Sequence, residues 1–247
     1  MNRKPQLLPQ FVLEQRDVVD SVLEEGRRLA LQGAEEGTLV WAHEQTAGRG
    51  RHGQPWVSPR GNFYCSLVLR PDFPLSVALQ LNYVAAIALG LTVADLVPAG
   101  ANLRYRWPND VLLNEAKVGV VVLELPDVRA DTPEWMVVGA AVNINSYPET
   151  TPFPAISLEA EGCSDVADTE LLEGFSRRFL SWINRWADEG FSPIRKFWVQ
   201  RANGMGATGQ IRLKNETLLA KLIELDENGA LSVELADGER RLIGVLD

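Results

Sequence analysis

The chain has 247 residues, 46% of them hydrophobic and 23% charged, which is typical of an ordinary soluble globular protein. Its 33 acidic and 24 basic side chains give a net charge of −9, which argues against a general binder of nucleic acid or of anionic membranes. Two cysteines and two histidines cannot supply a disulfide framework or a multi-histidine metal site. We find no secretory signal and no apolar run near the ~20 residues of a membrane span, so we expect a cytoplasmic protein.

The first part of the chain alternates predicted helices and strands around one glycine-rich loop. Apolar residues at helical spacing predict an amphipathic helix over 17–32, and residues 37–43 form a short apolar strand. Residues 44–61 are rich in Gly, Pro and Arg, which predicts a loop. A second strand over 62–70 and a long apolar helix over 77–97 follow.

The middle of the chain predicts a sheet covered on one face by helices. Short strands over 103–107 and 111–113 flank a Pro-Asn-Asp turn, as in a hairpin. Two near-continuous apolar runs, over 118–125 and 135–144, read as adjacent strands of that sheet. An acidic stretch leads into a second amphipathic helix over 170–191.

The pattern changes after the Gly-Met-Gly-Ala-Thr-Gly stretch at 204–209. Four short β segments, separated by Asn- and Gly-containing turns, predict a small β-barrel-like unit. We therefore expect an α+β architecture with a mixed or antiparallel sheet in a main domain over 1–200, and a small β domain over 201–247.

The loop at 48–53 reads Gly-Arg-Gly-Arg-His-Gly and lies in a basic part of the acidic chain. Residues 44–70 hold four arginines and a single glutamate. Glycines let consecutive backbone N–H groups converge on an anion, and arginines add charge-assisted hydrogen bonds to phosphate or carboxylate. The spacing fits neither a Walker A loop nor a dinucleotide fingerprint. By itself the loop is either an anion-binding loop or a solvated surface loop, and Trp56 after it is either a core anchor or a pocket wall.

The Pro-Asn-Asp turn ends at Asp110, and Lys117 stands seven residues further on, at the start of an apolar strand. A lysine there either reaches outward to solvent or faces a polar cavity that holds an anion, because burying it unpaired is costly. Asp110 would neutralise it, orient an amine or cap the turn. Asn143 ends another apolar strand, where it either builds a site or terminates the strand. Cys65, inside a predicted strand, is expected to pack as a small hydrophobe.

Together these segments resemble the biotin protein ligases of the biotinyl/lipoyl protein ligase superfamily. The resemblance rests on three motifs in the family's order, with its Asp-to-Lys spacing kept, and on shorter matches between and after them. The matching residues are Gln45-Thr46-Ala47-Gly48-Arg49-Gly50-Arg51-His52-Gly53 with Trp56, Ser58 and Pro59; Trp107-Pro108-Asn109-Asp110 with Lys117; Gly139 and Asn143; Ala155-Ile156-Ser157-Leu158; and Phe191 and Trp198.

The resemblance implies a fold and a reaction. The fold is a class II aminoacyl-tRNA-synthetase-like ligase core with a small C-terminal SH3-like β-barrel. The reaction uses ATP with Mg²⁺ to activate biotin as biotinyl-5'-AMP, and transfers the biotinyl group to a lysine of a biotin-acceptor (carboxyl carrier) protein. Fixed cations stabilise the charge that develops in such a step. Both monomers and homodimers occur in the family, and the sequence does not choose between them.

The resemblance also implies roles for individual residues. The implied catalytic residues are Lys117, Asp110 and Arg51. Those implied to bind the acid are Ser21, Gln45, Gly48, Arg49, Arg51, Trp56, Lys117 and Gly119. Those implied to bind the nucleotide are Arg51, Trp107, Asn109, Lys117 and Asn143, and none is assigned to a metal. Lys117 would offset the repulsion between carboxylate and α-phosphate, and Asp110 would orient or deprotonate the acceptor lysine.

Four positions depart from the family's pattern. Val22 replaces a hydroxyl residue beside Ser21, Val120 and Ala141 stand where glycines are usual, and His52 replaces an arginine. The residues implied to use ATP are kept, whereas the departures fall among those implied to bind the acid. Two alternatives to a biotin ligase therefore stay open. One is a ligase for lipoate, octanoate or another small carboxylic acid, and the other is a non-catalytic regulator that binds the ligand. About 15 residues precede the first predicted helix, so no helix-turn-helix domain is expected.

Overall fold

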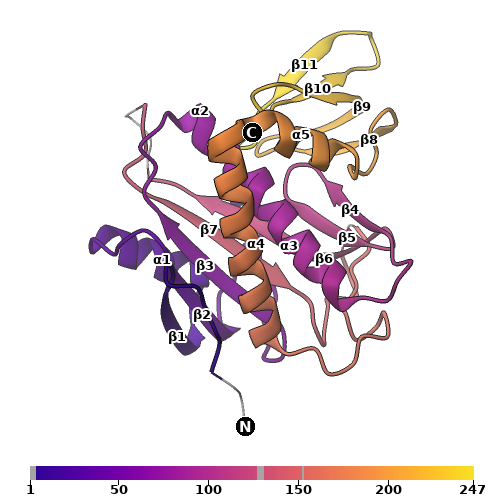
Figure 1. The fold of residues 1–247 in the computed structure, drawn as a ribbon. Helices are drawn as coiled ribbons and strands as arrows, with labels where there is room; N and C mark the ends of the chain where they lie inside the picture. The colour runs from indigo at the N-terminus through magenta and orange to yellow at the C-terminus, as the bar shows by residue number, and fades with distance from the viewer. Residues whose placement is uncertain (1–3, 127–130, 152) are drawn as a thin grey trace.

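The computed structural model of the protein describes residues 4–126, 131–151 and 153–247, and it contains two β-sheets (Figure 1). The larger sheet has seven strands in the order β1-β2-β3-β7-β6-β5-β4, in which β1 and β2 are parallel and the other neighbours antiparallel. Its strands are β1 (Val12–Val19), β2 (Thr38–Gln45), β3 (Phe63–Leu69), β4 (Leu103–Arg106), β5 (Asp110–Leu113), β6 (Ala116–Glu124) and β7 (Met136–Val142). The expected mixed sheet is therefore present.

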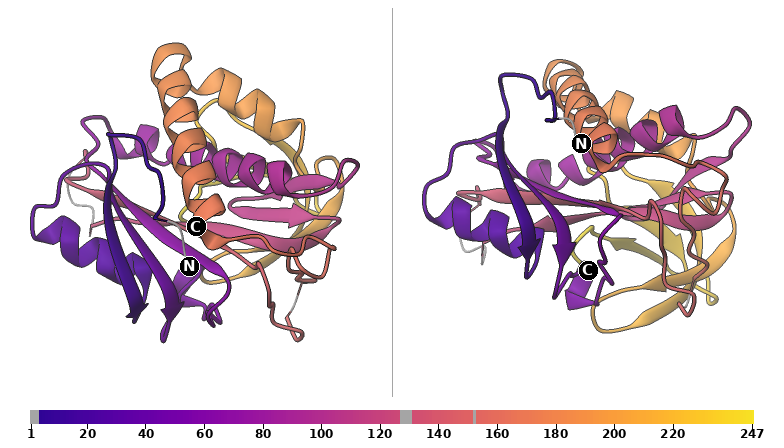
Figure 2. Two further views of the ribbon diagram at one scale, coloured as in Figure 1. Left: turned by 60° about the horizontal axis from the view of Figure 1, so that its bottom comes forward. Right: turned by 90° about the horizontal axis from the view of Figure 1, so that it is seen from below.

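Helices cover the larger sheet unequally. The helices are α1 (Val22–Leu31), α2 (Leu75–Ala78), α3 (Leu81–Leu96), α4 (Asp168–Glu189) and α5 (Phe191–Val199), with a 3₁₀ turn η1 (Arg51–Gly53) in the glycine-rich loop. Figure 2 (right) shows α3 and α4 stacked on one side of the sheet. Buried strand residues alternate between two cores: Met136 and Val138 pack with α3 and α4, whereas Val137 between them packs with α1.

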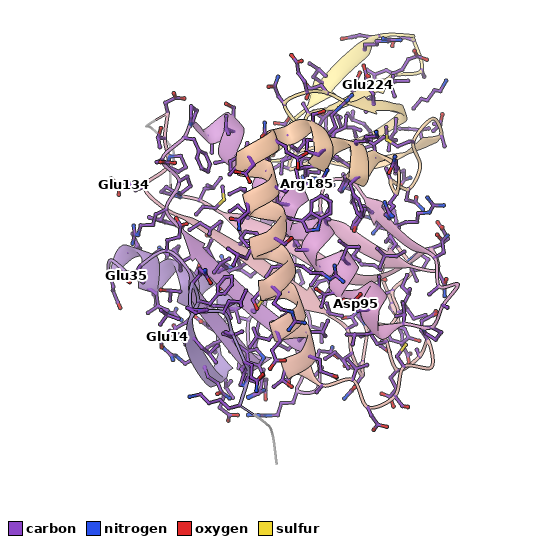
Figure 3. All side chains as sticks on the ribbon, in the orientation of Figure 1. Glu14, Glu35, Asp95, Glu134, Arg185 and Glu224 are labelled. Carbon is purple, nitrogen blue, oxygen red and sulfur yellow. The ribbon has the colours of Figure 1, made fainter. Side chains whose placement is uncertain are left out.

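The helix-covered side holds the main core. The stretch Leu75–Leu96 is long and apolar enough to cross a membrane by length and composition, but 78% of an apolar 18-residue window in it is buried inside the fold. A helix that is apolar on all sides fits such a central position. By contrast α4 is amphipathic, because Trp186 is buried whereas its neighbour Arg185 points outward (Figure 3). Asp95 near the end of α3 and Glu35 after α1 are exposed as well. Cys65 is fully buried in this core, where burial raises the pKa of its thiol, in agreement with a packing role.

Two helix predictions were wrong at their ends. The predicted helix over 17–32 begins only at Val22, because Val12–Val19 forms β1 at the edge of the sheet and Ser21 is the N-cap of α1. Val18 and Val22 satisfy helical spacing, but Val18 belongs to the strand. The helix predicted to end at 191 instead ends at Glu189, because its C-cap Gly190 has a φ of +73°, and α5 then follows.

The predicted C-terminal β segments form a separate antiparallel sheet in the order β11-β10-β9-β8. Its strands are β8 (Thr208–Arg212), β9 (Thr217–Leu225), β10 (Leu231–Glu234) and β11 (Arg240–Ile243). Buried residues of this sheet, among them Ile211, Leu222 and Val233, join the same core as α3. A small C-terminal β unit is thus confirmed, while its SH3-like closure and the boundary at 200/201 stay predictions.

Candidate active site

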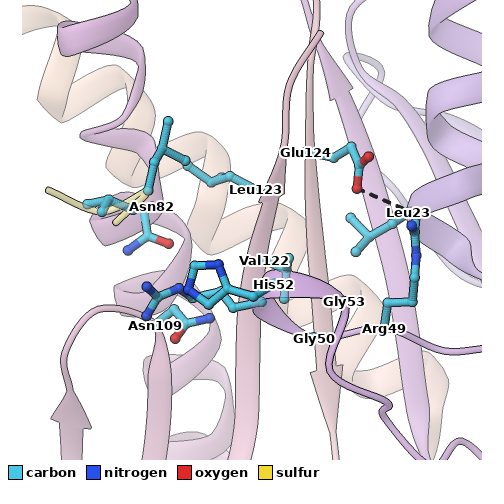
Figure 4. Close-up of a pocket in the computed structure, with 13 residues that line it drawn as sticks. Leu23, Arg49, Gly50, His52, Gly53, Asn82, Asn109, Val122, Leu123 and Glu124 are labelled. Atoms are coloured by element: carbon cyan, nitrogen blue, oxygen red, sulfur yellow. Dashed lines mark ion pairs between the residues drawn. The ribbon is translucent and has the colours of Figure 1, made fainter. Parts of the chain in front are cut away.

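Two adjoining pockets lie on the face of the larger sheet that carries α1. The larger has a volume of about 260 Å³ and is lined by the loop at 49–53, the end of β6, and parts of α3 and the C-terminal segment (Figure 4). The smaller has a volume of about 20 Å³ and lies between α1, β6 and β7. Leu23, Arg49 and Val122 line both pockets. One cation of the glycine-rich loop therefore stands where the two pockets meet.

The loop is held in place by tight packing at its start. Gln45, at the end of β2, accepts a hydrogen bond from the Val22 N–H at 2.8 Å and donates one to Ser58 Oγ at 2.9 Å. Gly48 packs so closely that a Cβ there would lie 2.4 Å from Ser58 Oγ and 2.6 Å from the Trp56 carbonyl oxygen. Glycine is therefore required at 48 by packing, and Gln45 fixes the N-terminus of α1 to the loop.

Three buried polar atoms around the smaller pocket have no hydrogen-bond partner among the described residues. They are Ser21 Oγ, Arg49 Nε and Trp56 Nε1. Arg49 and Trp56 line the smaller pocket, and Ser21 directly precedes its lining residue Val22. A buried polar group without a partner costs about 1–3 kcal/mol, so such atoms are uncommon unless a ligand or water satisfies them. Their grouping indicates a polar ligand.

Arg49 is held by two carboxylates. It pairs with Glu24 of α1 and lies 3.6 Å from Glu124 at the end of β6, an ion pair drawn in Figure 4. Burial raises the pKa of Glu124 above its ordinary value, although Arg49 opposes this change. Ligand anions that bind where the pockets meet would compete with these carboxylates for the guanidinium.

Arg51 lines the larger pocket only. Its Nη2 donates to the main-chain oxygen of Asp247 at 2.7 Å, and its guanidinium carbon lies 5.7 Å from the centroid of the Trp107 ring. Burial lowers the pKa of Arg51, partly offset by the charges of Asp110 and Asp247. Since Arg51 forms no ion pair in the described part of the chain, it is a cation prepared for an anionic ligand.

Lys117 and Asp110 form a charged pair beside the smaller pocket. Lys117 Nζ lies 3.2 Å from Asp110 Oδ1 and 5.0 Å from the centroid of the Trp56 ring, which lines that pocket. Arg106 Nε also donates to Asp110, at 2.9 Å. Within the described residues, neither Lys117 nor Asp110 lines either of these two pockets, but Lys117 contacts Trp56, which lines the smaller one.

The structure brings some predicted nucleotide contacts together and not others. Asn109 lines the larger pocket, and its Nδ2 donates to the Val121 carbonyl oxygen. Asn143 is buried directly after the end of β7, where its Nδ2 donates to the Ile156 carbonyl oxygen at 3.0 Å. Gly119 packs within the sheet, since a Cβ there would lie 2.9 Å from the Ala141 carbonyl oxygen. Asn143 and Gly119 are thus not among the described pocket-lining residues, and their ligand contacts stay predictions.

Several pocket residues were missed from the sequence. Val122 and Glu124 follow Val120 at every second position of β6 and share its face, so strand alternation could have identified them. Leu23 could have been found as the residue after Val22 at the start of α1. Val245 and Leu246 come from the far end of the sequence, and no local pattern marks them. The departures Val22, Val120 and Ala141 all line the smaller pocket, and His52 lines the larger one.

Metal-ligating side chains do not gather in the part of the chain that the structure describes: no group of three or more His, Cys, Asp or Glu could hold a metal ion there. Two cations, Arg49 and Arg51, line the pockets, and a third, Lys117, lies beside Trp56 next to the smaller one. Such a site suits anionic ligands.

Comparison with known proteins places these features in a family. The profile of the biotin/lipoate A/B protein ligase family matches residues 55–200. The chain is 31% identical over 246 residues to the bifunctional ligase/repressor BirA of Bacillus spizizenii, covering 97% of this chain and 74% of BirA. It is 36% identical over 221 residues to a biotin–[acetyl-CoA-carboxylase] ligase of Paracoccus denitrificans, covering 86% and 90%. A biotin protein ligase of Aquifex aeolicus, solved with biotin and ATP, superposes with a TM-score of 0.76 at 26% identity, covering 94% of each chain.

Proposed function

The chain belongs to the biotin/lipoate A/B protein ligase family, and from this membership and the geometry of the two pockets we infer that it is an ATP-dependent biotin–protein ligase. The observation that carries this function is the pair of adjoining pockets that share Arg49. A two-substrate site needs one place where the acid and the nucleotide meet, and a shared cation suits that place.

The reaction joins two anions and then an amine. In the first step a carboxylate oxygen of biotin attacks the α-phosphorus of ATP, the bond to the bridging oxygen breaks, and pyrophosphate leaves. In the second step the ε-amine of an acceptor lysine attacks the acyl carbon, AMP leaves and the amine proton is released. Mg²⁺ enters as part of the MgATP substrate and shields the phosphates. The cations of this chain reduce the repulsion in the first step.

We assign roles by position. Biotin occupies the smaller pocket, where Ser21 Oγ and Trp56 Nε1 supply unpartnered polar atoms. The nucleotide occupies the larger pocket beside Arg51 and Asn109. Arg49 and Lys117 then act on the carboxylate and α-phosphate between them. Asp110 already contacts Lys117, and we propose that it orients the incoming acceptor lysine.

Further proposals concern the folds of the two domains, the acceptor protein, the cellular compartment and the oligomeric state. We propose a class II aminoacyl-tRNA-synthetase-like core over 1–200 and an SH3-like barrel over 201–247, in keeping with the two sheets. The acceptor is proposed to be a carboxyl carrier protein, since the Paracoccus relative is named for acetyl-CoA carboxylase. The cytoplasm is the compartment that such an acceptor and ATP imply. The monomer and the homodimer remain two alternatives.

One observation favours a second candidate. Val120 and Ala141 stand where the family has glycines and reduce the smaller pocket, which has a volume of only about 20 Å³, and Val22 removes a hydroxyl from its lining. A smaller or narrower acid, such as octanoate, would need less rearrangement of these side chains than biotin.

The test is acid-dependent exchange of pyrophosphate into ATP, with biotin, lipoate and octanoate supplied separately. Exchange with biotin, followed by transfer of labelled biotin to a carrier protein, is the expected result. Exchange with octanoate or lipoate alone would assign the second candidate. Tight binding of biotin without exchange would identify a non-catalytic regulator.

A further inference from the structure

The C-terminal sheet reaches the larger pocket through the four residues that follow β11. Gly244 N donates to Asp247 Oδ2 at 2.7 Å, and Asp247 N donates to the Gly244 carbonyl oxygen at 3.3 Å, so residues 244–247 form a closed turn. Within this turn, Val245 and Leu246 line the larger pocket. Val245 is buried in the main core, which anchors the turn, whereas Leu246 is 45% exposed.

The same turn holds Arg51. The main-chain oxygen of Asp247 accepts the 2.7 Å hydrogen bond from Arg51 Nη2 described above. Arg51 is partly buried and pairs with no Asp or Glu side chain among the described residues, so this oxygen is the one hydrogen-bond acceptor that the structure gives its guanidinium. An arginine side chain has several rotamers, and a single fixed acceptor selects one of them.

A second connection joins the C-terminal sheet to Trp107, the aromatic partner of Arg51. Trp107 Nε1 donates to Tyr83 Oη at 3.1 Å, and Tyr83 Oη donates to the Gly229 carbonyl oxygen at 2.5 Å. Gly229 lies in the turn between β9 and β10, with φ of +92°, and a Cβ there would lie 2.9 Å from the Tyr83 ring. Two turns of one sheet thus support both members of the Arg51–Trp107 pair.

The geometry points to the C-terminal sheet as the device that positions Arg51 and Trp107 for the nucleotide, with Asp247 and Gly229 as positioning residues. This inference rests on the proposed function, because it assumes that a nucleotide occupies the larger pocket. The Asp247 turn supplies part of the pocket wall and the acceptor for Arg51. The Gly229 turn fixes Trp107 through Tyr83.

Asp247→Ala removes the oxygen that closes the turn, and Asp247→Asn keeps an acceptor there. Asp247→Ala should raise the KM for ATP in biotin-dependent exchange by about tenfold, the effect of one lost hydrogen bond to a charged group, while the KM for biotin and the kcat stay near wild type. Asp247→Asn should restore most of the affinity for ATP. In an Arg51→Ala background Asp247→Ala should have no further effect, because both changes remove one interaction.

Gly229→Ala tests the second turn, and Gly238→Ala is its matched control. Both glycines lie in turns of the C-terminal sheet at positive φ, +92° and +87°, but a Cβ at 238 meets nothing within 4 Å. Gly229→Ala should raise the KM for ATP, and Gly238→Ala should not, although both strain the backbone.

The outcomes separate this inference from the function on which it rests. Absence of exchange in the wild-type protein with any acid would contradict the proposed ligase. Normal exchange with an unchanged KM for ATP in Asp247→Ala and Gly229→Ala would overturn the positioning role alone. Equal effects of Asp247→Asn and Asp247→Ala, or of Gly229→Ala and Gly238→Ala, would overturn it as well.

Discussion

Val120 on β6 and Ala141 on β7 lie directly opposite each other across the sheet, and both side chains line the smaller pocket. These are two positions where the family's pattern has glycine. Opposed residues on antiparallel strands have Cβ atoms only about 5 Å apart, so both additions enter the same space. The remaining volume of about 20 Å³ is little more than the roughly 10–15 Å³ that a cavity needs to hold one water molecule. The acid must therefore displace side chains to enter.

Val120→Ala should enlarge this pocket. We expect a several-fold lower KM for biotin in pyrophosphate exchange, an unchanged KM for ATP, and a loss of about 1–3 kcal/mol in the free energy of unfolding. Val121→Ala is the matched control, because Val121 is equally buried on the same strand but packs in the core on the opposite face. A higher KM for biotin in Val120→Ala would mean that Val120 contacts the acid rather than crowding it.

Substitutions of Arg49 and Arg51 should affect the KM values for biotin and ATP differently. Arg49 lines both pockets and Arg51 only the larger one. Arg49→Ala should therefore raise the KM for biotin and for ATP, whereas Arg51→Ala should raise the KM for ATP alone, each by about 10–100-fold if one charge-assisted contact of 1.5–3 kcal/mol is lost. Arg60→Ala is the control, because Arg60 pairs with Asp17 and Glu44 outside the pockets. A biotin effect in Arg51→Ala would contradict the assignment of the pockets.

Local sequence patterns predicted the strands well but not the edge of the sheet. The apolar runs at 118–125 and 135–144 became β6 and β7 within two residues at each end, because strands buried on both faces are apolar throughout. The strand β1 was missed because it is parallel to β2 and half exposed, so its pattern is set by neighbours and not by its own sequence. Val18 fits both a strand and a helix, and only the pairing decides between them.

Some residues of the candidate site could likewise be predicted from local sequence motifs, and others could not. The glycine-rich loop and the Asp110–Lys117 pair could be found because the residues of each motif lie within a few positions of one another in the sequence. Leu246 could not, since it reaches the pocket through the packing of a second sheet. Conversely, Asn143 carries a motif, yet its amide is used to hold the Ile156 carbonyl oxygen, so a motif alone does not establish which way a side chain faces.

Gly48→Ala should disable the loop, while Gly50→Ala should be tolerated. A Cβ at 48 would lie 2.6 Å from the Trp56 carbonyl oxygen, whereas at 50 the nearest atom is the Gln54 carbonyl oxygen at 3.5 Å. Because backbone must move to admit the first methyl group, we expect Gly48→Ala to lose about 1–3 kcal/mol of stability and most exchange activity. Thermal unfolding and exchange assays on both variants check this. Equal behaviour of the two would show that packing does not explain the glycine at 48.

Lys117→Ala should slow adenylate formation without unfolding the protein. The lysine is partly exposed, and Asp110 keeps its hydrogen bond from Arg106 after the change. Removing one preorganised group that stabilises developing charge lowers kcat by about 100–1000-fold. Lys196→Ala, on the exposed side of α5, is the control. Exchange at the wild-type rate in Lys117→Ala would remove Lys117 from the mechanism.

Glu24 and Glu124 both face Arg49, yet they should affect stability with opposite signs. Burial raises the pKa of Glu124 above its ordinary 4.5. Burial also opposes ionisation of Glu24, but the hydrogen bond from Arg27 and the charge of Arg49 outweigh it, so the pKa of Glu24 is lowered. The folded protein thus binds the Glu124 proton more tightly than the unfolded chain does, and the Glu24 proton less tightly.

The sign of each contribution follows from proton linkage. Stability from Glu124 falls as the pH rises from the unfolded pKa through the folded one, so Glu124→Gln should be more stable than wild type at pH 7, with a gain that vanishes near pH 4. Stability from Glu24 is present above the unfolded pKa and is lost as the pH falls through the lower folded pKa, so Glu24→Gln should be less stable at pH 7. Urea unfolding of both variants between pH 4 and 8 measures these differences. Shifts of the same sign at pH 7 would contradict the arrangement of charges around Arg49.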